Sequence, residues 1–104
     1  MKLFGSYRSP FVRRVAITMN VFGMPFEHMD VPVFDKPDEI NVHNPLTRVP
    51  TLVLDDGEVL IESYAMLDAL DDMVGPEKAL FPASGAERRH VMRIAAAAVG
   101  TMDK

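Results

Sequence analysis

The sequence predicts an α/β domain in which helices cover a mixed β-sheet. Two observations carry this prediction: a strand–helix–strand order over residues 2–33 and a hairpin signal at Asp55-Asp56-Gly57. A helical crossover forces parallel pairing of the strands it connects, whereas a tight Asp-Gly turn forces antiparallel pairing. The expected element order is β-α-β-α-β-β-α, followed by one more helix.

The first helix is predicted over residues 10–22, after a strand at residues 2–7. Ser9 stands where an N-cap belongs, and Pro10 occupies the first helical position, where its missing N–H costs nothing. We expect Gly23 to end this helix, because glycine readily adopts the left-handed conformation found after a helix C-terminus.

The middle of the chain is predicted to hold three further strands and one broken segment. A second strand is expected at residues 26–33, and the two hairpin strands at residues 51–54 and 58–61. Prolines and asparagines interrupt residues 34–47, so only a short helix around residues 38–42 is considered there.

Two helices are predicted in the last third of the chain. Ser63 opens the first, the Gly75-Pro76 pair ends it, and a capping box at residues 84–87 opens the second. The apolar stripe of the second has no partner helix within these 104 residues. We therefore expect the chain to be the front part of something longer, and this helix to self-associate or to fray. The predicted organisation is a domain over residues 1–75, a linker over 76–85 and a helix over 86–104.

Composition excludes several classes of function. The formal net charge is −4, which argues against a nucleic-acid partner. Cysteine is absent, which excludes disulfides, cysteine nucleophiles and thiolate metal sites, and the three histidines show no metal-ligand spacing. The longest uninterrupted apolar run, residues 94–99, is too short for a membrane helix, and from the residues before the first strand we expect no signal peptide. A cytoplasmic protein with no metal and no membrane partner is expected.

Three positions stand at the starts of predicted elements, where backbone groups are available to a ligand. Ser9 begins a helix, whose N–H groups and dipole favour an anion. Val49-Pro50 precedes a strand, and we expect a cis peptide bond there that leaves the backbone of Val49 free. Glu62 and Ser63 begin another helix and suit an ammonium and a carboxylate respectively. Each position also has an ordinary explanation as a helix cap or a strand boundary.

In this order and spacing, the three positions make the sequence similar to the N-terminal domain of the glutathione S-transferase family. The resemblance rests on residues 9–15 (SPFVRRV), 44–52 (NPLTRVPTL) and 61–66 (IESYAM). Leu80-Phe81-Pro82 also resembles the family's passage into its helical second domain. The resemblance implies a thioredoxin-like fold, followed by the first helix of an all-α domain that is otherwise missing.

The resemblance implies a detoxifying transferase that activates the thiol of glutathione, its co-substrate, as a thiolate for attack on an electrophile, with no other cofactor. Ser9 matches the catalytic hydroxyl of the serine-type classes, Val49 the backbone partner of the cysteinyl part, and Arg48 a basic position near the glycyl carboxylate. Glu62 and Ser63 match the contacts to the γ-glutamyl part. The full set of matching glutathione positions is Ser9, Arg48, Val49, Pro50, Glu62 and Ser63.

Alternatives remain open at this point. Tyr7 is the rival catalytic hydroxyl, because other classes use a tyrosine at the end of the first strand; the Ser9-Pro10 placement favours Ser9. Arg8, Arg13 and Arg14 either raise the potential near the thiol or lie exposed on the helix.

A non-catalytic glutathione-binding or protein-interaction module is the alternative function, while the absence of cysteine nearly eliminates a glutaredoxin-like reductase. The resemblance also implies a homodimer. It implies a substrate pocket built largely by the missing domain. The sequence therefore does not identify the electrophile, and we expect this chain alone to have low activity.

Overall fold

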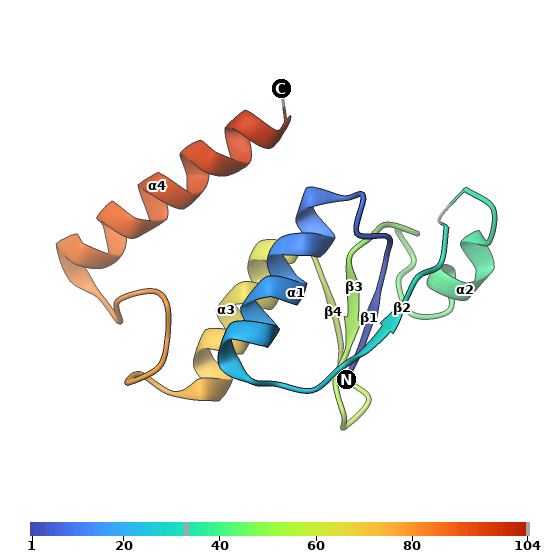
Figure 1. The fold of residues 1–104 in the computed structure, drawn as a ribbon, viewed down its shortest axis with the longest axis horizontal. Helices are drawn as coiled ribbons and strands as arrows, with labels where there is room; N and C mark the ends of the chain where they lie inside the picture. Colours follow the sequence, from blue (N-terminus) through green and yellow to red (C-terminus); the bar gives the residue numbers. More distant parts are fainter. Residues whose placement is uncertain (33, 104) are drawn as a thin grey trace. The chain divides into compact units, whose positions relative to one another are not determined.

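The structure is a computed structural model that describes residues 1–32 and 34–103 (Figure 1). The helices and strands follow the predicted order, and together with their arrangement they confirm the α/β fold class. The elements are β1 (Lys2–Phe4), α1 (Pro10–Phe22), β2 (Glu27–Met29), α2 (Pro37–Asn41), β3 (Thr51–Val53), β4 (Val59–Ile61), α3 (Ser63–Val74) and α4 (Gly85–Asp103).

The four strands form one mixed sheet in the order β2-β1-β3-β4. Strands β1 and β2 pair in parallel, and β3 and β4 pair antiparallel, as the crossover and the hairpin predict. The sequence did not predict which strands pair at the centre of the sheet. The structure places β1 antiparallel to β3, with Leu3 opposite Leu52.

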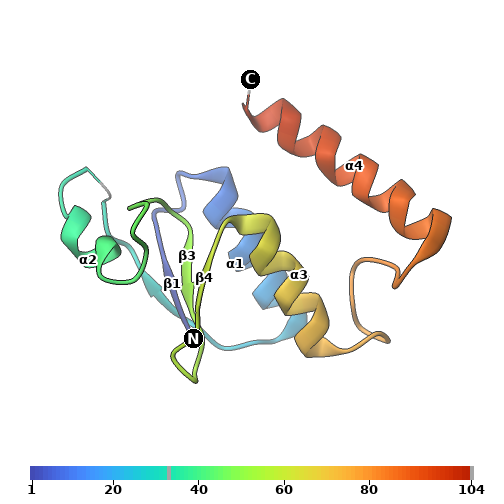
Figure 2. The same ribbon diagram turned by 180° about the vertical axis from the view of Figure 1, so that it is seen from behind.

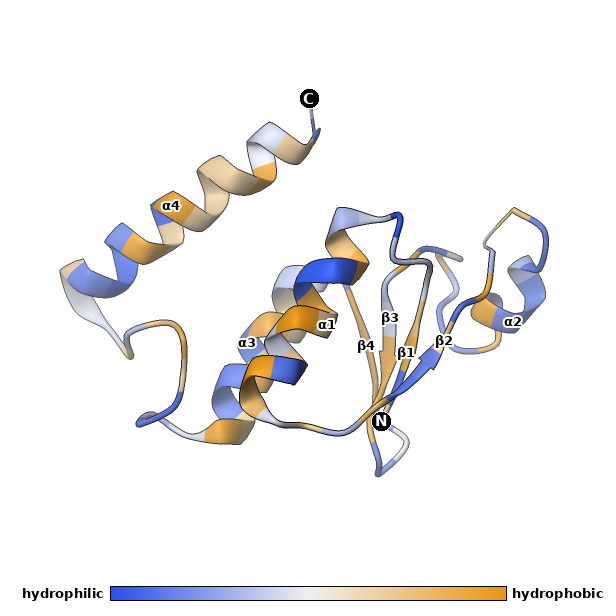
Figure 3. Cartoon of the chain, in the orientation of Figure 1, coloured by the Kyte–Doolittle hydropathy of each residue, from blue (hydrophilic) through white to orange (hydrophobic). Residues whose placement is uncertain are grey.

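Hydrophobic side chains fill both faces of this sheet. Because side chains alternate along a strand, Leu3 and Phe4 point to opposite faces. Leu3 packs in a cluster with residues of α1 and α3, and Phe4 packs with Ile40 of α2. Figures 1 and 2 accordingly show α1 and α3 on one side of the strands and α2 on the other. Figure 3 shows hydrophilic colours on β2, one of the two edge strands.

Helix α1 has the ends that the sequence predicts. The Ser9 hydroxyl accepts a hydrogen bond from the backbone N–H of Val12 at 3.3 Å, and Pro10 is the first helical residue. Gly23 adopts the left-handed conformation at φ 68° and donates its N–H to Asn20. Local signals therefore determine this helix at both ends.

The strands are shorter than the sequence predicts. Strand β1 ends at Phe4, because Gly5 turns the chain at φ 132°. Strand β2 covers only part of the first half of the predicted residues 26–33, because a tight turn from the N–H of Val31 to the carbonyl of Met29 ends it. Residue 33 lies outside the described residues.

The chain divides into two compact units, the first ending at Leu70 and the second beginning at Asp71. In the second unit, the Asp71 carboxylate accepts the backbone N–H groups of Leu80 and Phe81 at 3.0 and 2.9 Å. Helix α4 has no buried residue. None of the helices in the described residues is long and apolar enough to cross a membrane. The predicted boundaries at residues 75 and 85 stay a prediction, and residue 104 lies outside the described residues.

Candidate functional site

Ser9 lies half-buried at the start of α1, at the end of the loop that follows β1. Its Oγ accepts the Val12 N–H, and its backbone N–H donates to the carbonyl of Ser6 at 3.1 Å. A hydroxyl has one hydrogen and two lone pairs, so the capping bond leaves the hydrogen of Ser9 to donate to a ligand. Capping the helix and binding an anion are therefore compatible roles for this side chain.

Gly5 brings the loop after β1 against the segment that precedes β3. A Cβ placed on Gly5 would lie 2.6 Å from Cγ2 of Val12 and 2.9 Å from Cβ of Val49. The missing side chain thus lets the first turn of α1 and Val49 approach the same point of the backbone. This contact is the first link between two of the segments singled out in the sequence.

The Val49–Pro50 peptide bond is cis, which confirms that prediction. Within the described residues, the N–H and C=O of Val49 have no hydrogen-bond partner. The turn before it is held by the buried Asn44, whose Nδ2 donates to the carbonyl of Arg48 at 3.3 Å and to Oγ1 of Thr51 at 3.1 Å. Val49 therefore presents free backbone groups from a turn that buried hydrogen bonds hold in place.

Glu62 connects β4 to α3 in a left-handed conformation, at φ 71°. Its carbonyl accepts the N–H of Met66 at 3.1 Å, so Glu62 occupies the N-cap position and Ser63 is the first helical residue. Non-glycine residues are uncommon at positive φ, and such residues gather at functional sites. Ser63 is buried, with 4% of its surface exposed.

Arg14 joins this site from α1 and is one of three arginines whose role the sequence left undecided. Its Nε and one terminal nitrogen donate to Oγ of Ser63 at 3.0 and 2.6 Å, across 49 residues of chain. The sequence feature that could have indicated this role is the place of Arg14 on the same helix as Ser9, little more than one turn further along. That spacing does not tell which arginine of the Arg13-Arg14 pair turns toward α3.

A third link connects Arg48 with Glu62, whose charged groups lie 3.9 Å apart. Both side chains are largely exposed, so this pair contributes little to stability. The Gly5 contact, the Arg14–Ser63 bonds and the Arg48–Glu62 pair together join the start of α1, the turn before β3 and the start of α3. The structure thus brings all three sequence-selected segments to one region.

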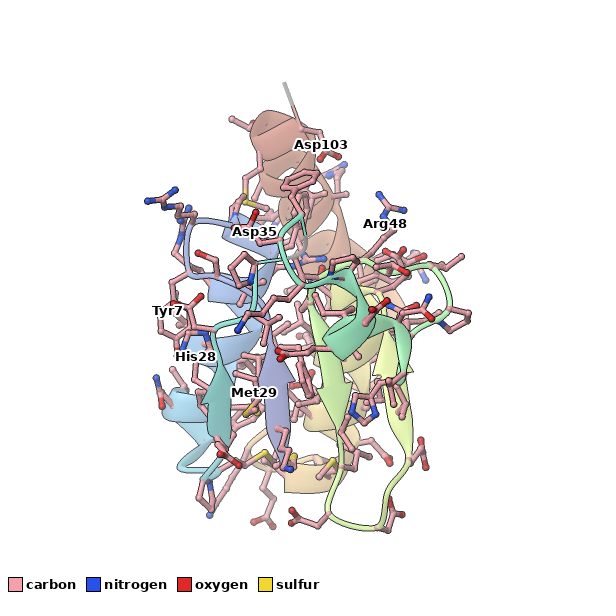
Figure 4. The ribbon with its side chains drawn as sticks, turned by 90° about the vertical axis from the view of Figure 1, so that its right-hand side faces the viewer. Tyr7, His28, Met29, Asp35, Arg48 and Asp103 are labelled. Atoms are coloured by element: carbon pink, nitrogen blue, oxygen red, sulfur yellow. The ribbon has the colours of Figure 1, made fainter. Side chains whose placement is uncertain are left out.

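Tyr7 lies elsewhere, toward the opposite edge of the sheet. Its ring stacks on His28 of β2 with 3.9 Å between ring centroids and 7° between planes, and Figure 4 shows the two rings together, apart from Arg48. His28 also donates from Nε2 to the carbonyl of Gly5 at 2.6 Å. Arg13 donates to the Tyr7 carbonyl at 2.7 Å, so it braces the loop that carries Ser9. Tyr7 is thereby held at the β2 edge, with β1 between it and β3.

Known proteins resemble this chain in sequence. Residues 3–78 match the family model described as "Glutathione S-transferase, N-terminal domain". The GST-like protein YibF of Escherichia coli (strain K12) is 36% identical over 104 residues, which cover 99% of this chain and 50% of that protein. The maleylpyruvate isomerase of a Ralstonia species is 36% identical over 100 residues, or 92% of this chain and 46% of that protein.

Solved structures resemble it as well. Holo maleyl pyruvate isomerase, described as a bacterial glutathione S-transferase in the Zeta class, gives a TM-score of 0.81 at 33% identity, over 92% of this chain and 46% of that one. A glutathione transferase family member from Pseudomonas fluorescens Pf-5, solved with bound glutathione, gives 0.81 at 34% identity, over 98% and 51%. The chain therefore spans about half the length of each of these relatives.

Proposed function

This chain belongs to the glutathione S-transferase family, whose N-terminal domain has the thioredoxin-like fold, and we propose that it binds glutathione and activates the thiol as a thiolate. The observation that carries the proposal is the joining of Ser9, Val49 and the Glu62-Ser63 pair into one region by three independent contacts. Each of these positions offers a different chemical group, and glutathione carries a complement for each.

The proposed ligand lies extended between the starts of α1 and α3. Ser63 and the free N–H groups of the first turn of α3 suit the γ-glutamyl carboxylate, and Glu62 suits the adjacent ammonium. The free N–H and C=O of Val49 suit strand-like pairing with the cysteinyl residue. Arg48 suits the glycyl carboxylate.

Ser9 is the proposed catalytic residue, and the energy asked of it is modest. A free thiol has a pKa near ~8.5, and lowering it by about two units requires ~2.7 kcal/mol in favour of the thiolate. One hydrogen bond to a charged acceptor contributes ~1.5–3 kcal/mol, and a helix N-terminus adds ~0.3–1 kcal/mol. The Ser9 hydrogen and the start of α1 together supply this amount. A serine-type mechanism is part of this proposal.

Two reactions begin with the same thiolate. Conjugation leaves the electrophile attached to sulfur, whereas isomerisation adds the thiolate to a double bond, allows rotation and releases it again. Similarity to maleylpyruvate isomerase in both sequence and structure favours isomerisation as the second candidate. Turnover of a generic aromatic electrophile, compared with turnover of maleylpyruvate, separates the two. Binding of glutathione with no lowering of its thiol pKa would favour the non-catalytic module.

Substitution of Ser9 tests the proposed thiolate activation. In Ser9→Ala, the pKa of bound glutathione should rise by ~1–2 units, because a charge-assisted hydrogen bond worth ~1.5–3 kcal/mol is lost. Affinity at acid pH should change little, since Val49, Glu62 and Ser63 remain. Ultraviolet titration of the bound thiolate measures the shift. Tyr7→Phe is the matched control; a shift in that variant with none in Ser9→Ala would transfer the role to Tyr7.

A further inference from the structure

We propose that Arg14 determines the ligand specificity at the start of α3 by holding the Ser63 hydroxyl as a hydrogen-bond donor. The inference rests on the proposed function, since the group selected is the γ-glutamyl carboxylate of glutathione. Arg14 acts through Ser63 and is a positioning residue. It would make this end of the site accept a carboxylate and reject a neutral amide.

The hydrogen bonds of the Ser63 hydroxyl carry the first step. Its oxygen receives two N–H groups from one guanidinium, at 3.0 and 2.6 Å, and these occupy both lone pairs. Within the described residues, the hydroxyl hydrogen has no acceptor. A serine hydroxyl ordinarily donates or accepts by rotating its hydrogen, but this one has only donation left to offer a ligand.

The backbone around Ser63 carries the second step. The first backbone bond of α3 runs from the Met66 N–H to the Glu62 carbonyl, so the N–H groups of residues 63–65 have no partner within the helix. These N–H groups are further hydrogen-bond donors beside the Ser63 hydroxyl, which Arg14 holds as a donor. A carboxylate accepts from all of them, whereas the NH2 group of an amide would meet donors only. With Arg14 bound, the Ser63 hydroxyl can only donate a hydrogen bond to the ligand, as the neighbouring backbone N–H groups do.

Two explanations of the Arg14–Ser63 contact make different predictions. If the contact only ties α1 to α3, its loss lowers stability and weakens all ligands alike. If it orients the hydroxyl, its loss reduces the preference for carboxylate over amide. The ratio of two dissociation constants separates these cases, because a general loss of folded protein cancels from the ratio.

The test is calorimetric titration with glutathione and with the analogue whose γ-glutamyl α-carboxylate is converted to an amide. We expect the unsubstituted chain to prefer glutathione by roughly 10–100-fold, the range of a charge-assisted hydrogen bond. In Arg14→Met and in Ser63→Ala this preference should fall about tenfold. The double variant should lose no more than either single variant, since both changes remove the same oriented hydrogen.

Two further variants make the test specific. Arg14→Lys keeps the positive charge but lacks the planar pair of N–H groups, so it should also lose most of the preference. Arg89→Met removes a charge from an exposed position of α4 and should keep the preference. If Arg14→Met does not fold, Arg14→Lys and Ser63→Ala complete the comparison.

The outcomes are distinct. A preference unchanged in Arg14→Lys or Arg14→Met, while Ser63→Ala loses it, overturns the role of Arg14 and leaves the proposed function standing. Equal weakening of both ligands shows a purely structural contact and also overturns the inference. Absence of glutathione binding by the unsubstituted chain overturns the proposed function itself.

Discussion

The hydroxyls of Ser9 and Ser63 have the same pattern of hydrogen bonds. Ser9 accepts the N–H of Val12, and Ser63 accepts two N–H groups of Arg14, so each hydroxyl keeps its hydrogen for a ligand. A structural role and the proposed chemical role are compatible in the same atoms, because a hydroxyl accepts and donates at once. At the residue scale, the ordinary explanation of Ser9 as a helix cap therefore does not exclude a catalytic one.

Substitution of Glu62 tests its proposed contact with glutathione. In Glu62→Gln, affinity for glutathione should fall about tenfold, because the ligand ammonium loses a charged partner. The free energy of unfolding should change by less than about 0.5 kcal/mol, since the Arg48–Glu62 pair is exposed and 3.9 Å long. Calorimetric titration and urea unfolding measure the two quantities. Glu77→Gln, at an exposed position after α3, is the control; equal weakening in both variants would contradict a local role for Glu62.

The elements of the first unit meet through a few close backbone approaches. Gly5 ends β1, donates its N–H to the Met29 carbonyl at 3.0 Å and lies against both Val12 and Val49. The sequence predicts β1 and α1 from local signals. Nothing in the residues around Gly5 predicts its contact with Val49, which lies 44 positions away. The helix caps could be predicted because they involve neighbours in the chain. The strand ends could not, because tertiary hydrogen bonds and turns decide where a ladder stops.

Substitution of Gly5 tests this approach. Gly5→Ala should destabilise the fold by ~2–4 kcal/mol, because the new Cβ would lie 2.6 Å from Val12 and the backbone has φ 132°. Gly57→Ala is the matched control: its φ is 92° and nothing lies within 4 Å of the added Cβ, so only the backbone cost of ~1–2 kcal/mol remains. Denaturant unfolding measures both. Equal losses in the two variants would show that the contact of Gly5 with Val12 and Val49 imposes no constraint.

At the scale of the whole molecule, the second unit differs from the first. The first unit buries two hydrophobic clusters around its sheet, whereas α4 has no buried residue. Ile94 is 57% exposed and Met102 37% exposed, on the apolar stripe that the sequence predicts for this helix. Exposed apolar surface favours association.

We accordingly predict that the 104-residue chain self-associates through α4. The apparent mass in light scattering should rise with concentration, and Ile94→Asp should suppress the rise by placing a charge on the apolar stripe. Ala96→Asp places the same charge outside that stripe and should not. A concentration-independent monomer mass, or equal suppression by both substitutions, would contradict association through this surface.

The sequence by itself determined the α/β class, the order of elements, both caps of α1 and the pairing directions of β1 with β2 and of β3 with β4. These features depend on neighbouring residues and on the length of the connections between strands. Tertiary structure alone decided that β1 lies beside β3, that Arg14 holds Ser63 across 49 residues, and that Tyr7 stacks on His28. The physical reason is that packing of helices on the sheet brings together side chains whose separation along the chain carries no local signal.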